Sequence, residues 1–265
     1  MKLNDYFQIA WDQYIETTPS AKKINDLLSQ RGESVVNDHI AFRTFDNHAL
    51  CMDRFIEFFK QYDYEVCGDY VFEEKKLDAV HLENKDKACP KIFISQLQNN
   101  NFSKKLQRLI KECVESEDFD FNELLISGSK NWHISYDQYQ MALEESEYAA
   151  WVLAHGIRPN HFTVLVNELS SFSGLGELNS FLKENDFEMN TSGGEIKGNP
   201  AVYLEQSSTM ADSIHVDFDG ETHQVVSCYY EFAKRYPIKE DILFQGFVTS
   251  SADRIFESTN KVIDK

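Results

Sequence analysis

An internal repeat constrains the fold of this chain more than any other feature of its sequence. Each copy begins with a strand-like run that carries a histidine and continues into an amphipathic helix that ends near an aspartate. His39 and Asp63 are 24 positions apart, and His161 and Asp186 are 25 positions apart. Each copy then closes on a run that begins with proline, Pro90-Lys-Ile-Phe-Ile-Ser-Gln96 and Pro200-Ala-Val-Tyr-Leu-Glu-Gln206. Three matches in the same order indicate a duplicated structural unit.

The periodicity between the matched points predicts a β-α-β-β-β order for each copy. Two such units give an α+β fold, and we expect them to pair side by side into a half-open barrel. Additional helices are predicted before the first unit and between the two units. We expect a single domain over 1–265 with five segments: N-terminal helices at 1–35, the first unit at 36–96, a helical connection at 97–157, the second unit at 158–232 and a C-terminal segment at 233–265.

The charge balance limits the kinds of partner that we expect. The chain has 44 acidic and 26 basic residues, a net charge of -18, which argues against binding to nucleic acid or to anionic membranes. No stretch approaches the roughly 20 apolar residues that span a bilayer, and no signal-peptide run follows Met1. These features predict a cytoplasmic protein. The five cysteines are widely spaced and form no CxxC pair, so neither a disulfide framework nor a thiolate zinc site is indicated.

The repeat also predicts a metal site. It aligns His39 with His161 and Ser95 with Glu205, and paired units would bring these four positions together across a joint sheet. Two histidines and one carboxylate leave half of an octahedron open, which is the ligand set of non-haem Fe(II) enzymes that bind substrate and oxygen on one ion. The sequence therefore predicts that His39, His161 and Glu205 hold Fe(II), although zinc or manganese can use the same ligands.

Arg43 is expected to face the same cavity as this metal. Side chains at i, i+2 and i+4 of a strand share a face, so Arg43 lies on the face of His39, about 13 Å further along the strand. A buried guanidinium needs a partner, and a substrate carboxylate would supply two hydrogen bonds. Asp63 or another acid of the chain is the alternative partner. A cavity with a metal at one end and a cation at the other suits a dianionic acid.

Other histidines compete for these roles. His155 lies six residues before His161 and is a rival for the second ligand. His81 and His215 lie on predicted strands and could face the cavity. Because a histidine on a strand is more often structural than a ligand, the choice of His39 and His161 depends on the register of the repeat.

Four segments carry a resemblance to a known family. The chain resembles the 2-oxoadipate dioxygenase/decarboxylase (hydroxyglutarate synthase) family, and its paired units resemble the vicinal oxygen chelate superfamily. The resemblance covers residues from about 36 to 259. The matching segments are His39-Ile-Ala-Phe-Arg43, Asn160-His161-Phe-Thr163, Tyr203-Leu-Glu205 and Phe247-Val-Thr-Ser-Ser-Ala-Asp-Arg-Ile-Phe256.

The resemblance implies site residues and a reaction. It implies metal ligands at His39, His161 and Glu205, a substrate-carboxylate arginine at Arg43, and substrate contacts from Ser250 and Ser251. It implies an Fe(II) enzyme that uses O2 to decarboxylate a small 2-oxo diacid and to hydroxylate the shortened acid. The expected example is 2-oxoadipate, converted to 2-hydroxyglutarate and CO2 in lysine breakdown.

The C-terminal segment departs from the family pattern. Members usually carry Pro-Val-Ser-Ala-Ala-Gly there, whereas this chain reads Thr249-Ser-Ser-Ala-Asp-Arg254. The departure leaves the identity of the 2-oxo acid more open than the type of reaction. Two other functions fit the same residues: a zinc- or manganese-dependent hydrolase or isomerase, and a non-catalytic protein that binds a small acid. Metal content and oxygen consumption would separate the three.

Overall fold

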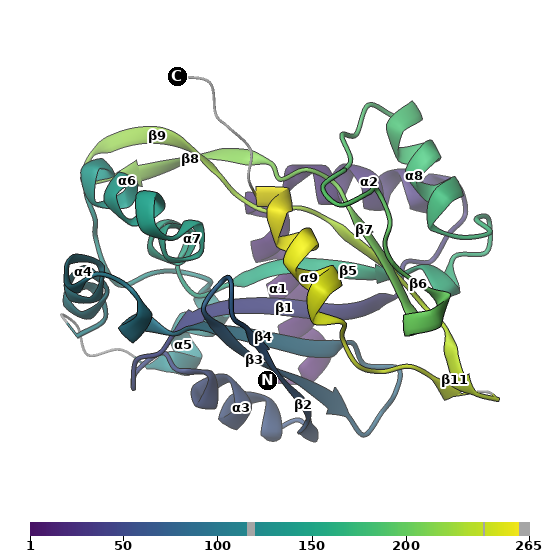
Figure 1. Ribbon diagram of the computed structural model, residues 1–265, viewed down its shortest axis with the longest axis horizontal. Helices are drawn as coiled ribbons and strands as arrows, with labels where there is room; N and C mark the ends of the chain where they lie inside the picture. The colour runs from purple at the N-terminus through teal and green to yellow at the C-terminus, as the bar shows by residue number, and fades with distance from the viewer. Residues whose placement is uncertain (116–119, 241, 260–265) are drawn as a thin grey trace.

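The centre of the molecule is a curled mixed sheet. The computed structural model describes residues 1–115, 120–240 and 242–259, and its eight-stranded sheet has the order β2-β3-β4-β1-β5-β10-β7-β6. The predicted α+β half-barrel is confirmed (Figure 1). Both units contribute strands to this one sheet, and the site described below lies where they join.

The first unit follows the predicted β-α-β-β-β order. The helix forms because Phe55, Phe58 and Phe59 recur at helical spacing, and all three are buried. The first and last strands of the unit pair in parallel. The unit consists of β1 (Asn37–Phe45), α3 (Met52–Lys60), β2 (Tyr64–Phe72), β3 (Leu77–Asn84) and β4 (Lys91–Leu97).

The second unit repeats this order and contains an inserted hairpin. Its main elements are β5 (Pro159–Leu165), α8 (Leu175–Glu184), β6 (Lys197–Asn199), β7 (Leu204–Ser208) and β10 (Glu231–Arg235). The insertion, β8 (Ser213–Phe218) and β9 (Glu221–Val226), forms a separate two-stranded sheet. It turns at Asp219 and Gly220, with φ values of 50° and 89°. An Asp-Gly pair favours such a turn because both central residues need positive φ.

The predicted repeat is confirmed at Asp63 and Asp186 but wrong at the closing proline. The two aspartates follow the helices of their units with φ values of 64° and 65°, a left-handed conformation that aspartate tolerates. Pro90 immediately precedes β4, whereas Pro200 begins a short 3-10 turn ahead of β7. In the sheet order β7 corresponds to β3, and β10 corresponds to β4. The alignment of Ser95 with Glu205 was therefore wrong by one strand, because the hairpin separates β7 from the closing strand.

The two units meet along β1 and β5, which pair antiparallel. Ala41 on β1 pairs with Phe93 on β4, and Thr163 on β5 pairs with Glu231 on β10. Ala41 and Thr163 each follow a histidine by two residues. The joint therefore has an approximate twofold symmetry that relates Phe93 to Glu231.

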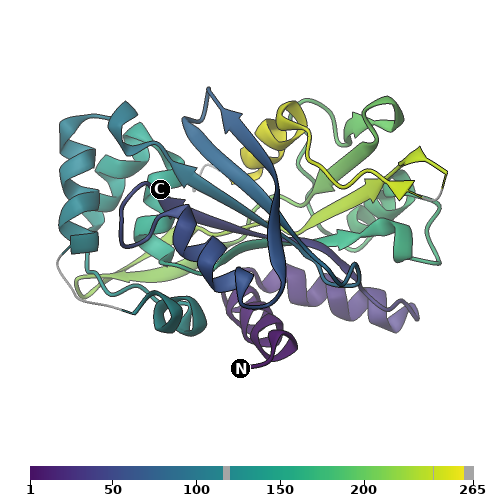
Figure 2. The same cartoon turned by 90° about the horizontal axis from the view of Figure 1, so that it is seen from below.

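Helices cover both faces of the sheet (Figures 1 and 2). α1 (Leu3–Thr17) and α2 (Pro19–Gln30) lie on one face, together with α3, and α9 (Thr249–Phe256) crosses the other face. The helical connection predicted at 97–157 is also present. It contains α4 (Lys104–Glu115), α5 (Phe121–Ser127), α6 (Tyr136–Glu145) and α7 (Glu147–His155).

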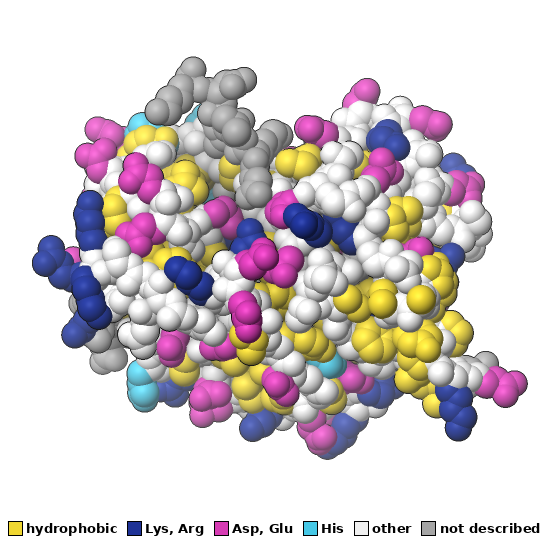
Figure 3. Space-filling model, viewed as in Figure 1, with side chains coloured by type: hydrophobic (Ala, Val, Ile, Leu, Met, Phe, Trp, Pro, Cys, Tyr) yellow, Lys and Arg dark blue, Asp and Glu magenta, His cyan; other side chains and the backbone are white. Residues whose placement is uncertain are grey.

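Acidic and basic side chains are interspersed on the face seen in Figure 3. Apolar side chains gather there near β11 (Pro237–Lys239) and β12 (Ile242–Leu243), where Ile238 and Ile242 are half exposed. Among the described residues, no helix combines the length and the apolar character needed to cross a membrane.

Candidate metal centre

Three side chains from three adjacent strands converge at the joint. His39 on β1, His161 on β5 and Glu231 on β10 each offer one ligand atom, and these atoms lie within 4.8 Å of one another. His161 Nε2 is 3.1 Å from Glu231 Oε2, and His39 Nε2 is 3.9 Å from Glu231 Oε1. All three residues are buried. Strand alternation turns them toward the same face of the sheet.

The residue before each histidine fixes its ring. His39 Nδ1 lies 3.1 Å from Asp38 Oδ1, and His161 Nδ1 lies 2.9 Å from Asn160 Oδ1. If each Nδ1 donates to its oxygen, each neutral ring keeps a lone pair on Nε2. His161 Nε2 then faces Glu231 Oε2, whereas His39 Nε2 lies 3.1 Å from the Thr163 hydroxyl and 3.9 Å from Glu231 Oε1. His161 Nε2 and Glu231 Oε2 would then be two acceptors 3.1 Å apart, which repel one another unless a proton or a cation lies between them. The donor set therefore fits a bound divalent metal ion.

Gln206 on β7 anchors the carboxylate of this group. Its Nε2 donates to Glu231 Oε1 at 2.6 Å, which turns its own Oε1 away from the carboxylate. That oxygen is buried and has no hydrogen-bond partner within the described parts of the chain. Burial alone would raise the pKa of Glu231, but when a proton and not a cation lies between His161 and the carboxylate, the hydrogen bond from His161 and the one from Gln206 hold the pKa below its usual value. Glu231 is therefore an ionised ligand candidate.

A buried ion pair stands behind His39. Arg235 on β10 binds both carboxylate oxygens of Asp38, with Nη2 to Oδ1 at 2.8 Å and Nε to Oδ2 at 2.5 Å. Burial opposes ionisation of Asp38, but the charge and hydrogen bonds of Arg235 hold its pKa well below the usual value. Asp38 thus stays anionic and keeps His39 Nδ1 as a donor.

A small cavity lies directly over the three candidate ligands. Its volume of about 20 Å³ is close to that of one water molecule. Aromatic and aliphatic side chains from α9 and the segment before it cover the cavity. Its lining residues are His39, Phe93, His161, Gln206, Glu231, Phe247, Ala252, Ile255 and Phe256.

Arg43 is buried on the face of His39, as predicted, but a residue of the chain already pairs with it. Its Nη1 donates to Glu147 Oε1 on α7 at 2.9 Å, so the alternative of an acidic partner within the chain is confirmed, and that acid is Glu147 and not Asp63. Burial would lower the pKa of Arg43, but Glu147 raises it, so the guanidinium is charged. Arg43 Nε is buried and has no acceptor among the residues described. The guanidinium carbon is 6.0 Å from the ring of Phe256, which lines the cavity.

The structure does not bring Glu205 into the group of ligands. Glu205 lies on β7 opposite Lys234, and its Oε2 accepts a hydrogen bond from the hydroxyl of Tyr236 at 2.7 Å. The predicted position failed because β7, which carries Glu205, is separated from β5 by β10. Glu231 on the intervening strand occupies the place that the sequence analysis assigned to Glu205.

Ser250 and Ser251 lie in the first turn of α9. Ser250 is exposed and Ser251 is buried beside Gly198 of β6. Neither lines the cavity described above, although Ala252 on the same helix does. Their contact with a substrate remains a prediction.

The rival histidines have other partners. His155 Nε2 lies 2.9 Å from the carbonyl oxygen of Val226, and burial lowers its pKa to about 3. His81 lies between the hydroxyl of Tyr70 and the carboxylate of Glu83. His215 lies on β8, in the separate hairpin sheet. None of the three belongs to the cluster of candidate ligands found in the described part of the molecule.

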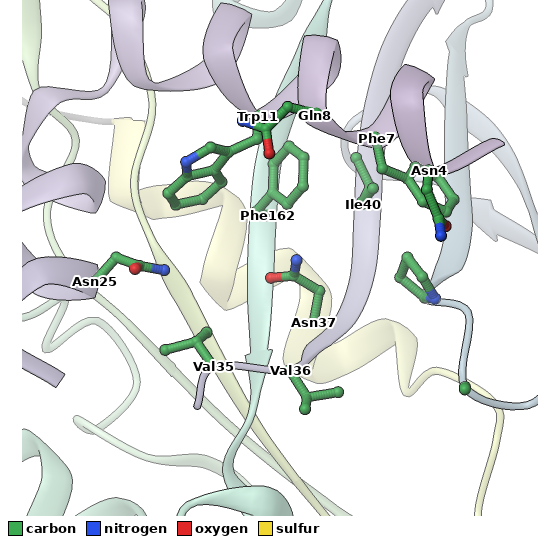
Figure 4. Close-up of a pocket in the computed structure, with 12 residues that line it drawn as sticks. Asn4, Phe7, Gln8, Trp11, Asn25, Val35, Val36, Asn37, Ile40 and Phe162 are labelled. Atoms are coloured by element: carbon green, nitrogen blue, oxygen red, sulfur yellow. The ribbon is translucent and has the colours of Figure 1, made fainter. Parts of the chain in front are cut away.

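A more open pocket lies on the opposite face of the sheet (Figure 4). It has a volume of about 450 Å³ and lies between α1 and the start of β1. Ile40 and Phe162, which line it (Figure 4), directly follow His39 and His161 in the chain, so strand alternation places them on the opposite face from the candidate ligands. No acidic, basic, cysteine or histidine side chain is among its lining residues, so we do not assign catalysis to it.

Sequence reasoning missed Glu231, Gln206 and the Asp38–Arg235 pair. One signal could have found Glu231: it is the first carboxylate after the largely apolar run Val225-Val-Ser-Cys-Tyr-Tyr230. Polar residues directly before both histidines, Asp38 and Asn160, were a second signal. Neither signal indicates which strands become neighbours in the sheet. The order of the strands determines which carboxylate meets the two histidines.

A family profile and a curated relative that match this chain carry the same description. The family profile described as 2-oxoadipate dioxygenase/decarboxylase matches residues 3–127 and 125–238. The 2-oxoadipate dioxygenase/decarboxylase of Oryza sativa subsp. japonica, named as chloroplastic/amyloplastic, is 32% identical over 93% of this chain and 76% of its own length.

Two solved structures are also similar. The hydroxyglutarate synthase of Oryza sativa, in complex with 2-oxoadipate, superposes with a TM-score of 0.88 at 31% identity and covers 96% of this chain and 91% of its own. A protein from Shewanella frigidimarina that carries a provisional hydrolase name gives a TM-score of 0.87 at 44% identity, over 93% of this chain and 97% of its own. From the profile match and the similarity to the rice enzyme, we conclude that this chain belongs to the 2-oxoadipate dioxygenase/decarboxylase family.

Proposed function

We propose that the protein is an Fe(II)-dependent dioxygenase that oxidatively decarboxylates a 2-oxo diacid and hydroxylates the shortened product. The substrate we infer first is 2-oxoadipate, with 2-hydroxyglutarate and CO2 as products. The observation that carries the proposal is the buried convergence of His39, His161 and Glu231. We infer Glu231 as the third ligand, in place of Glu205.

The donor set suits iron because it leaves coordination positions open for the reactants. Two neutral imidazoles and one carboxylate occupy one side of an ion and leave open positions for a chelating 2-oxo acid and for oxygen. Bound Fe(II) would supply the redox chemistry that activates oxygen. The chain's own part is to hold this geometry: Asp38 and Asn160 orient the rings, and Gln206 orients the carboxylate.

The remaining site residues would bind and enclose the substrate. Arg43 keeps a buried Nε donor without a partner among the described residues, and this donor suits the distal carboxylate of a diacid. Phe247, Ile255 and Phe256 would exclude water from the reacting atoms. Because the cavity of about 20 Å³ is too small for a six-carbon acid, these side chains must shift for a substrate to bind.

Anaerobic loading with Fe(II), followed by 2-oxoadipate and air, tests the proposal. We expect oxygen consumption, release of CO2 and formation of 2-hydroxyglutarate, all lost in His39→Ala. Glu205→Gln is the matched control and should remain active. If the iron-loaded protein releases no CO2 from 2-oxo diacids of five to seven carbons, the proposal is wrong.

The name of the Shewanella relative motivates one alternative, a zinc- or manganese-dependent hydrolase or isomerase on the same ligands. Turnover by zinc-loaded protein without oxygen would favour that alternative. The cytoplasmic location also stays a prediction, since the rice relative is named as chloroplastic/amyloplastic.

A further inference from the structure

We propose that Arg235 is a positioning residue that fixes the orientation of the ligand His39 and the place of Phe247, the ring that covers the site. The inference rests on the proposed metal centre and extends it to a residue outside the ligand set. Arg235 would act through Asp38 on one side and through the backbone before Phe247 on the other. The contacts on each side are hydrogen bonds of a fully buried guanidinium.

On the ligand side, Arg235 fixes the carboxylate that fixes the imidazole. Its Nε and Nη2 bind the two oxygens of Asp38, and Asp38 Oδ1 is also the acceptor 3.1 Å from His39 Nδ1. A two-point fork of this kind has little rotational freedom. The plane of the carboxylate, and with it the direction of His39 Nε2, is therefore set by the guanidinium.

On the cover side, the same guanidinium holds the chain that leads into α9. Arg235 Nη1 donates to the carbonyl oxygens of Phe244 and Gly246, both at 2.9 Å. The guanidinium carbon lies 5.3 Å from the centre of the Phe247 ring. That ring meets the ring of His39 edge-on at a centroid distance of 4.8 Å. One cation thus positions both the ligand and the ring that covers it.

Comparison of the two units indicates that the Asp38–Arg235 ion pair is not needed for β1 to form. The counterpart of Asp38 is Asn160, a neutral residue that binds the Nδ1 of His161 in the same way. Strand β5 therefore keeps the same geometry with an amide, and a buried ion pair is in itself weak evidence for stability. The charged pair behind His39 is specific to the side of the site where the cover lies.

Titration of metal-free protein with Co(II), followed by its visible absorption, tests this role without an activity assay. We expect Arg235→Met to weaken Co(II) binding by about 10- to 100-fold, the usual effect of a residue that orients a ligand, and to change the absorption spectrum. Amides from Phe244 to Val248 should also exchange hydrogen faster. Arg158→Met is the matched control, since Arg158 is a largely buried arginine that donates to the Gly128 carbonyl, and it should bind Co(II) within about twofold of the original chain.

Two further variants keep the test decisive. Arg235→Lys retains the charge but not the fork, so a folded protein with weakened Co(II) binding supports the role even if Arg235→Met does not fold. The double variant Asp38→Asn/Arg235→Met should bind Co(II) no more weakly than the worse single variant, because both act on His39 by one route. If the losses of Co(II) affinity in the two single variants add up in the double variant, Arg235 does not act on His39 through Asp38.

The two proposals fail in different ways. If His39→Ala binds Co(II) as well as the original chain, the metal centre itself is wrong. If His39→Ala loses Co(II) while folded Arg235→Lys binds it normally and with an unchanged spectrum, the metal centre stands and the role of Arg235 is refuted.

Discussion

The two units share a strand order but differ at the positions that face their joint. Where the second unit has Glu231, the first has Phe93, and both line the cavity over the histidines. Where the first unit has Arg43, four residues after its histidine, the second has Leu165. The duplicated backbone supplies a matched pair of imidazoles, and the differences supply one carboxylate, one apolar wall and one cation. A symmetric frame thus produces a single, one-sided site.

Loss of the Glu231 carboxylate, which only the second unit has, should have the largest effect on metal binding. We expect Glu231→Gln to lower affinity for Fe(II) by at least about 100-fold, since the change removes a proposed ligand and not merely a group that orients one. Metal content by mass spectrometry and turnover with 2-oxoadipate measure the effect. Glu205→Gln loses a hydrogen bond with Tyr236 and should retain its metal. Equal losses in the two variants would contradict the choice of Glu231.

Adding a carboxylate to the first unit should remove the difference between the two units at this position. Phe93→Glu places an acid at the counterpart of Glu231, where Phe93 is 4% exposed. We expect the metal-free protein to lose about 4 kcal/mol of unfolding free energy, because packing is lost and a carboxylate is buried. Metal should recover part of that loss while the extra ligand blocks turnover. Phe93→Leu is the control, and it should lose about 1 kcal/mol.

The hairpin, which the first unit lacks, should make stability sensitive to acid. Burial lowers the pKa of His155 to about 3 while its Nε2 lies 2.9 Å from the Val226 carbonyl on β9. Below pH 6.5 the unfolded chain binds a proton at His155 that the folded protein does not bind until about pH 3. Acidification therefore favours unfolding, by up to about 3 kcal/mol between pH 6.5 and pH 4.

Chemical denaturation of His155→Gln over this pH range checks the sign and the size of that effect. The variant keeps an amide donor for Val226 but cannot take up the proton. Its unfolding free energy should therefore fall less steeply with acid than that of the original chain. Parallel pH profiles for the two proteins would show that His155 does not carry the effect.

Arg43 should give the smallest of these effects, since Glu147 already neutralises its charge. We expect Arg43→Lys to raise KM for a 2-oxo diacid about tenfold, because an ammonium cannot donate from a fixed fork. Bound metal should be unchanged. A 2-oxo acid without a distal carboxylate serves as the comparison substrate and should be affected less. Loss of metal instead would show that Arg43 supports the ligands and not the substrate.

Local patterns allowed much of the fold to be predicted. Helical and alternating periodicities placed the elements of the first unit and the first strand and helix of the second, but not the closing strand β10. Asp63 and Asp186 marked equivalent ends of two helices. The same alternation placed His39 and Arg43 on one face, and both are buried there. These features depend on residues close together in the chain, and such residues are what periodicity reports.

What the sequence determined by itself is the duplicated strand order, the two histidines and the burial of Arg43. Only the tertiary structure decided that β10 lies beside β5, so that Glu231 and not Glu205 meets the histidines. It also decided that Arg43 pairs with Glu147 and that Phe247 covers His39. The physical reason is that a strand's own side chains set which faces it buries, whereas its neighbour depends on hydrogen bonding between distant segments. An inserted hairpin changes that neighbour without altering the local pattern.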